Sequence, residues 1–477
     1  MRRLQIVLPF FVAGIGTCFA GLLLDRFQHL EVFTKIDELF LVLPALLGLK
    51  GNLQMTLASR FSTHSHLGHI QTHDDLLGLT CANLSLNQCF SIVVCLLASI
   101  LVTVIQQVTV LNSEFDLKHT IIITATVLLT SSITSFLLDI LMILVVQAAA
   151  HYSLNPDNVA TPLAASLGDI IALVLCSQLA GLFYASRNEM AFYWLAVPTI
   201  VVYILLIPIW VTITKRNPHT ESILTKANHW YPLISAMVIS SIGGIILKLA
   251  VSKSDDIALF QPVICGVGGN LVAVQASRLA TQLHRECQPG ELPERGSSAC
   301  INPLEFVTSD EVHFKVSRLL IAIVVPGQVC FYLLCTTLNS TRYGVSFNFL
   351  LMYLAGSQLQ VIVLLYLAYV LTFVLWRNRI DPDNCTIPYL TSISDVLGAV
   401  IITVICLMVT PTPTTTTTTT TATAATTATT TAATATMATA TMTPAPPPQP
   451  PPPSAQTTTT AAAAKQVSSP VNQRMIG

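Results

Sequence analysis

The sequence carries one pattern of Pro, Gly and Asn twice, each time inside an apolar segment. Residues 44–53 read PALLGLKGNL and residues 262–271 read PVICGVGGNL, at a constant offset of 218. A second pair, residues 156–169 and 382–395, shares Pro-Asp-Asn, a further Pro and Ser, and a final Asp at an offset of 226. An acid inside an apolar span is costly unless it has a function. The duplication therefore predicts a transporter or channel built from two similar membrane units.

Composition supports the membrane class and excludes others. Hydrophobic residues make up 52% of the chain, charged residues 10%, and the mean hydropathy is +0.67, values unlike those of a soluble domain. A net charge of -1 gives no electrostatic basis for binding nucleic acid. The 12 cysteines show no metal-binding spacing and are expected to be small core residues.

Hydropathy predicts about eleven spans, each close to the roughly 20 residues that cross a bilayer. They cover residues 4–24, 38–59, 89–111, 120–150, 161–185, 191–214, 231–251, 258–280, 317–338, 346–376 and 388–410. We therefore expect an all-α polytopic membrane protein. The first apolar run is long enough to span and lacks a clear cleavage site, so we expect no signal peptide.

The spans predict four regions along the chain. Residues 1–188 form a first five-helix repeat, 189–229 a connecting helix and loop, and 230–410 a second five-helix repeat. Residues 411–477 form a Thr/Ala/Pro-rich tail too simple in composition to build a core, which we expect to be disordered. Six crossings separate matching spans, so the two repeats are expected to run parallel, related by an axis along the membrane normal.

The distribution of Lys and Arg predicts the orientation. With the N-terminus in the cytoplasm, 13 of these residues fall in inside segments and six in outside loops, as the positive-inside rule favours. The tail then lies outside. Three sequons exist, at Asn83, Asn339 and Asn384, and only Asn339 is predicted to face the glycosylation machinery.

The repeated residues have properties suited to lining a pore. Proline removes a backbone donor and glycine lets backbones unwind or approach closely, so we expect an interrupted helix in each repeat. An Asn amide adds a neutral oxygen for a cation. The alternative is helix packing through small residues and an amide cross-link. The pore-lining candidates are Pro44, Gly48, Gly51, Asn52, Pro262, Gly266, Gly269 and Asn270.

The two aspartates that end the second motif are the metal-binding candidates. Asp169 and Asp395 are each expected about two turns inside a span, where a pseudo-twofold axis would bring them together. Magnesium suits such a site because it keeps several waters and is held by one or two carboxylates. The alternative for each acid is a hydrogen bond to the backbone, or protonation.

Three segments, 43–60, 155–169 and 261–273, resemble the signatures of the MgtE-like transporters of solute carrier family 41, and the similarity covers about residues 5–408. The resemblance implies magnesium transport by two MgtE-like halves in one chain, which would act as a pseudo-dimeric monomer. It also implies that Asp169 and Asp395 form the central ion site and that the Pro-to-Asn segments line the pore. We expect no enzyme activity and no cofactor: magnesium is the transported ion, with sodium as the coupling ion.

Several features depart from the family pattern. Ser394 precedes Asp395 where the family usually has Gly, so the second half of the site is expected to be less faithful. Asp139 and Lys248 are charges in apolar runs without an assigned role. The family's longer acidic N-terminus and the soluble magnesium-sensing domain of bacterial members are expected to be missing.

Other functions were weighed against ion transport. His64, His66, His69 and His73 lie in a segment that could bind zinc, but their irregular spacing favours a solvated cytoplasmic loop. Paired intramembrane aspartates also occur in presenilin-type proteases, but the order of the motifs is wrong here. A magnesium channel remains an alternative to a sodium-coupled exchanger. The plasma membrane is the expected location, with the mitochondrial inner membrane as the alternative.

Overall fold

A computed structural model describes residues 4–66, 72–109, 116–152, 156–188, 191–253, 256–292, 312–339 and 347–409. These residues contain 11 helices long and apolar enough to cross a membrane, and no strand. The helices are α1 (Leu4–Phe27), α3 (Glu38–His66), α4 (His73–Thr109), α5 (Leu117–His151), α6 (Pro156–Ala185), α7 (Ala191–Thr214), α9 (Ala227–Val251), α10 (Asp256–Glu286), α12 (Val312–Leu338), α13 (Phe347–Arg377) and α14 (Pro382–Val409). Three short elements join them: α2 (Glu31–Lys35), η1 (Ser186–Asn188) and α8 (Pro218–Thr225).

The predicted fold class is confirmed: the protein is an all-α polytopic membrane protein. The chain divides into two units, Met1–Thr414 and Thr415–Gly477. The second unit and the whole of the predicted tail 411–477 lie outside the described residues.

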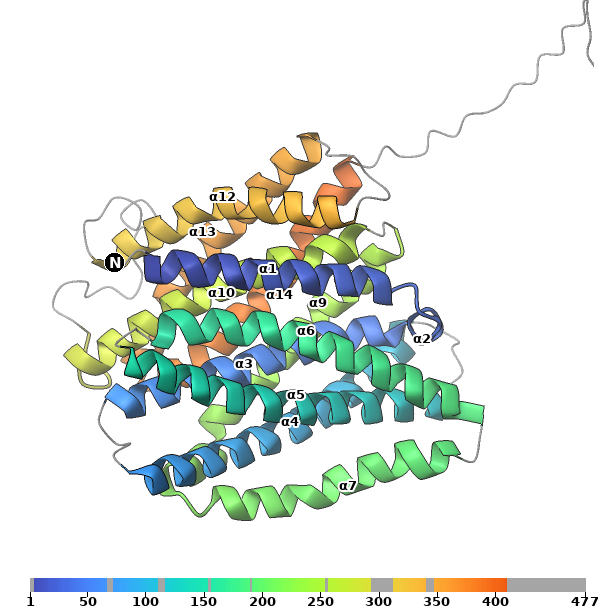
Figure 1. Cartoon of the computed structure of the whole chain (residues 1–477), viewed down its shortest axis with the longest axis horizontal. Coiled ribbons are helices and arrows are strands. Elements are labelled where there is room, and N and C mark those ends of the chain that lie inside the picture. The colour runs from blue at the N-terminus through green and yellow to red at the C-terminus, as the bar shows by residue number, and fades with distance from the viewer. Residues whose placement is uncertain are drawn as a thin grey trace, which may run out of the picture. The chain divides into compact units, whose positions relative to one another are not determined.

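The two halves pack their helices in the same pattern (Figure 1). In the first half α6 packs against α1, α3 and α5, and in the second half α14 packs against α9, α10 and α13. The first helix of each half also packs against the other half: α1 packs against α10, and α9 packs against α3. This correspondence is the packing expected of a pseudo-twofold arrangement.

The connecting helix α7 lies at the edge of the bundle, where it contacts α4 and α5 (Figure 1). Only 6% of the most apolar stretch of α7 is buried within the protein. Large side chains such as Trp194 and Leu205 are exposed. In a bilayer these side chains meet lipid tails rather than water, so their exposure costs little.

Two pairs of helices approach so closely that only glycine fits at the crossing. A Cβ atom added at Gly21 of α1 would overlap the carbonyl oxygen of Leu259 on α10. A Cβ atom added at Gly244 of α9 would overlap the carbonyl oxygen of Leu41 on α3. The two leucines are related by the offset of the first repeated motif, so the same crossing occurs twice.

The predicted helix interruptions are wrong. Both α3 and α10 continue through Pro44 and Pro262 without a break. A proline removes only one helical hydrogen bond, at a cost of about 3 kcal/mol, and the packing of each helix against its neighbours maintains the helix. The two prolines therefore act within continuous helices.

Several helices begin earlier than hydropathy predicted, because their first turns are polar. Pro156 and Pro382 are the first residues of α6 and α14, a position where proline needs no hydrogen bond. At the start of α4, Thr72, which precedes the helix, and Asp75 exchange side chain–backbone hydrogen bonds as in a capping box. Asp75 N donates to Thr72 Oγ1 and Thr72 N donates to Asp75 Oδ2, each at 3.1 Å. The predicted solvated loop is shorter than expected: its start belongs to α3, its end to α4, and residues 67–71 lie outside the described residues.

The two unassigned charges have polar partners. The Asp139 Oδ1 atom on α5 accepts hydrogen bonds from Gln54 Nε2 at 3.0 Å and Asn87 Nδ2 at 2.9 Å. Lys248 Nζ lies 2.9 Å from Asp37 Oδ2 and 2.8 Å from Gln106 Oε1. Both charges therefore join helices of the bundle, which is the usual condition for polar groups at membrane depth.

The predicted orientation is tested by glycosylation. Asn83 is 1% exposed within α4, with Nδ2 donating to Leu79 O, and Asn384 lies in the first turn of α14. Asn339 directly follows α12 and donates to Asp25 Oδ2 at 3.1 Å, a bond that glycosylation must break. We expect partial N-glycosylation of Asn339 alone.

The measurement is the shift in gel mobility on enzymatic removal of N-glycans from the protein expressed in animal cells. The shift should vanish in Asn339→Gln and persist in Asn83→Gln, the matched control. A glycan mapped to Asn83 or Asn384 would contradict the orientation.

Candidate functional site

One cavity of about 70 Å³ lies between the two halves of the bundle. All ten residues predicted from the repeats line it: Pro44, Gly48, Gly51, Asn52, Asp169, Pro262, Gly266, Gly269, Asn270 and Asp395. They come from α3 and α6 of the first half and from α10 and α14 of the second. The structure thus brings the repeated residues together around one space.

The two carboxylates occupy matching places in their helices. Asp169 stands as far from Pro156, the start of α6, as Asp395 stands from Pro382, the start of α14. That places both about 20 Å into their helices, deeper than the two turns predicted. None of the described residues lining the cavity is Lys, Arg or His. Two acids thus share one cavity with no basic side chain in its described lining, which favours an incoming cation.

Hydrogen bonding around the cavity is asymmetric. Ser240 Oγ on α9 donates to Asp395 Oδ2 at 2.9 Å. Thr17 holds the matching position on α1 but donates to Gly14 O at 2.8 Å within its own helix. Ser240 therefore holds the Asp395 carboxylate, whereas the hydroxyl of Thr17 is used within its own helix.

The two amides differ in the same way. Asn52 Oδ1 lies 2.5 Å from the Thr391 hydroxyl, whereas the buried Asn270 Oδ1 has no hydrogen-bond partner among the described residues. Ala165 replaces Thr391 at the matching position of the first half. An unpaired buried amide oxygen costs about 1–3 kcal/mol, and an ion or its water shell would satisfy it.

The repeated glycines fall into two classes. A Cβ atom at Gly48 would lie 3.1 Å from both Asp395 Oδ2 and Ser240 Oγ, and one at Gly266 would overlap the Thr17 side chain. Gly51 and Gly269 have room, since the nearest atoms to an added Cβ lie 3.9 and 3.8 Å away. The first glycine of each motif permits close packing, whereas the second keeps space free in the cavity.

Ser394 does not add a polar group to the cavity. Its hydroxyl donates to Cys265 O on α10 at 3.0 Å and accepts from Gln360 Nε2 on α13 at 3.1 Å. Ser394 is not among the residues that line the cavity. The departure from the family's glycine therefore adds a link between α10, α13 and α14 beside Asp395.

Sequence reasoning missed Ser240, Thr17, Gly21 and Gly244. These residues belong to a third repeat, between α1 and α9 at an offset of 223, which also matches Pro9 with Pro232. This third repeat is present in the sequence, but small residues are common in membrane helices and carry no charge, so their recurrence does not by itself indicate a site.

A comparison with protein families decides the class of the protein. The family model named MgtE, described as a divalent cation transporter, matches the chain twice, over residues 43–179 and 261–405. The chain belongs to the MgtE family. The starts of the two matches differ by the offset of the first repeated motif, and their ends differ by the offset of the second. Because this family consists of transporters, the protein is not an enzyme and the protease interpretation is excluded.

Two similar proteins are members of solute carrier family 41. Mouse solute carrier family 41 member 3 is 40% identical over 83% of this chain and 80% of its own length. Human solute carrier family 41 member 2 is 39% identical over 84% of this chain and 69% of its own length. The predicted family is confirmed. No solved structure matches the chain.

The two glycine classes of this member of the MgtE family can be distinguished by their alanine variants. Gly48→Ala forces Asp395 or Ser240 to move, and overpacking of this kind typically costs about 1–3 kcal/mol. Gly51→Ala meets no close atom and gains up to about 1 kcal/mol of helix propensity. We expect a lower unfolding temperature in detergent for Gly48→Ala and an equal or higher one for Gly51→Ala. Equal losses in both variants would contradict the assignment.

Proposed function

We propose that this chain transports magnesium, and that the central cavity is its ion site with Asp169 and Asp395 as the anionic groups. The observation that carries the proposal is the convergence of two carboxylates and two amides on one cavity without a basic residue among its described lining. Carboxylate and amide oxygens are the hard ligands that magnesium prefers. Membership of a family of divalent cation transporters supports the same interpretation.

The size of the cavity favours a hydrated ion. A water molecule needs about 10–15 Å³ of cavity, so 70 Å³ accommodates roughly five waters or an ion with part of its shell. Magnesium gives up its waters reluctantly and usually keeps several of them. The side chains would then contact the ion largely through its water shell.

The Pro-to-Asn segments of α3 and α10 would form the wall of this pathway. The bond between Asn52 and Thr391 supports packing for one amide, whereas the unpartnered Asn270 oxygen supports contact with the ion or its waters. Gly51 and Gly269 would leave this wall free of side chains next to the two amides.

We further propose sodium-coupled exchange, in the plasma membrane, by a single pseudo-dimeric chain. The support is the resemblance to solute carrier family 41 and the two complete halves within one polypeptide. A magnesium channel is the alternative, because one central site serves either mechanism, and the mitochondrial inner membrane is the alternative location.

Substitution of the carboxylates tests the ion site. Asp169→Ala or Asp395→Ala removes a charge of the pair and should reduce magnesium uptake into cells at least tenfold at matched surface expression. The Asn variants should be less impaired because a neutral oxygen still meets the hydrated ion. Ser240→Ala should be milder than Asp395→Ala, since it releases the carboxylate but keeps its charge. Uptake equal to that of the unmodified protein in both Ala variants would rule out the proposed pair.

A second measurement separates exchanger from channel. Purified protein in liposomes should move magnesium faster when a sodium gradient opposes the magnesium flux, and each flux should stop when the other ion is absent. Liposomes carrying Asp169→Ala serve as the control for leakage. Magnesium flux that follows only its own gradient, unchanged by sodium, would identify a channel.

A further inference from the structure

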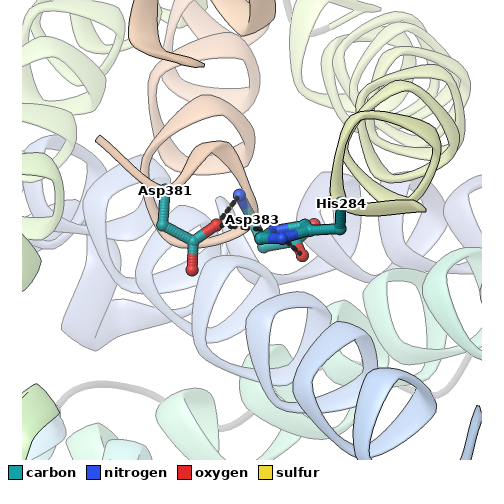
Figure 2. A group of neighbouring side chains, drawn as sticks. All are labelled: His284, Asp381 and Asp383. Atoms are coloured by element: carbon teal, nitrogen blue, oxygen red, sulfur yellow. Dashed lines mark hydrogen bonds and ion pairs between the residues drawn. The ribbon is translucent and has the colours of Figure 1, made fainter. Parts of the chain in front are cut away.

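A second group of metal-ligating side chains lies at one end of the second half, apart from the central cavity. His284 is in the last turn of α10, Asp381 precedes α14 and Asp383 lies in its first turn (Figure 2). Asp383 and Asp395 are separated by more than three turns of α14, which corresponds to about 18 Å along the helix. The two sites are therefore separate.

The spacing of the three ligand atoms fits one bound metal ion. His284 Nε2 lies 3.2 Å from Asp381 Oδ1 and 3.4 Å from Asp383 Oδ2, and all three atoms lie within 4.8 Å of one another. A metal with ligands at about 2.0–2.2 Å places neighbouring ligands about 2.8–3.6 Å apart, whether its geometry is tetrahedral or octahedral. The two measured nitrogen–oxygen distances fall in that range.

Neighbouring residues hold the ligands in place. The His284 ring meets the Trp376 ring edge-on, with centroids 4.9 Å apart, and Trp376 Nε1 donates to Glu291 O at 2.9 Å. Asn384 Nδ2 donates to Asp381 Oδ2 at 2.8 Å, the carboxylate oxygen that does not face His284. Outer hydrogen bonds of this kind orient the ligands of metal sites.

The internal repeat gives an independent observation. His66 matches His284 at the offset of the first repeated motif, and Asp157 matches Asp383 at the offset of the second. Both ligand types thus recur in the first half, where their side chains lie outside the described residues. Asp381 has Asn155 as its counterpart, so the full set of three is specific to the second half.

The local charges favour a doubly charged ion. Two carboxylates, Asp381 and Asp383, face the single imidazole of His284. Asp381 also interacts electrostatically with Arg60 and His229. A cation must compete with these positive charges, and a divalent ion gains more from the two carboxylates than a monovalent one.

We propose that His284, Asp381 and Asp383 bind a divalent transition-metal cation of the Mn²⁺ or Zn²⁺ type. An imidazole nitrogen favours such ions over magnesium, which prefers oxygen alone. The bound ion would join the end of α10 to the start of α14, two helices that line the central cavity. The orientation predicted from the charges of the loops puts this end in the cytoplasm. A cytoplasmic transition metal would therefore stabilise one arrangement of these two helices.

Metal binding is measured on the purified full chain, without transport. The test uses the double variant Asp169→Asn/Asp395→Asn, in which the central site is weakened. Binding of one equivalent of Mn²⁺ to this variant should lower the electron paramagnetic resonance signal of free Mn²⁺, even in excess Mg²⁺. Adding His284→Ala or Asp383→Asn should weaken this binding at least tenfold. His29→Ala, which removes an exposed histidine outside the cluster, is the matched control and should leave binding unchanged.

The proposal is overturned if the double variant binds no Mn²⁺, or if His284→Ala binds it as tightly as the His29→Ala control. Should His284→Ala not purify as a single species, His284→Cys provides the test, because a thiolate favours soft ions. That variant should bind Cd²⁺ at least tenfold more tightly than the unmodified histidine does, and no gain would also overturn the site. Neither result depends on whether the chain transports magnesium.

Discussion

Two carboxylates beside one cavity whose described lining holds no basic residue are the constraint on which the architecture depends. Two negative charges beside one small cavity repel each other and lose part of their hydration, so bound water, protons or a cation would stabilise the site. The chain places Asp169 and Asp395 at matching positions of α6 and α14. The surrounding glycines and amides then have a common physical role, which is to keep space and oxygen atoms beside the charges.

A single chain allows the two halves to differ, which two identical subunits cannot do. Lys50 is 1% exposed on α3, where Nζ donates to Thr130 O at 3.1 Å and Ser131 O at 3.2 Å. The matching residue of the second half is Gly268, which lies against Gln360 and Ser394. The first half is thus joined by a buried lysine amine and the second by hydrogen bonds of neutral side chains. Ser240 holds Asp395, and the described residues show no matching hydrogen bond from Thr17 to Asp169.

Much of the fold and ten of the residues that line the cavity were predictable, because polar and helix-disturbing residues stand out in an apolar sequence. Helix number followed from the length of apolar runs, and the repeats followed from Pro, Gly, Asn and Asp at fixed offsets. The starts of α6 and α14 were missed, since Pro156 and Pro382 open polar turns that hydropathy discounts. The roles of Ser240 and Thr391 were not predictable, because each donates to a helix distant in sequence. The position of His284 beside Asp381 also depends on tertiary packing.

The incorrect prediction of broken helices shows what the repeated prolines do. Leu41 and Leu259, whose carbonyls face Gly244 and Gly21, each lie one helical turn before a repeated proline. In both halves this close backbone approach therefore occurs in the helical turn that ends at the proline, where the hydrogen-bonding pattern is already disturbed. Because a glycine from the other half fills this position, the disturbed turn is packed against backbone and does not unwind. The prolines thus mark where the halves interlock, one turn before the glycines and amides that line the cavity.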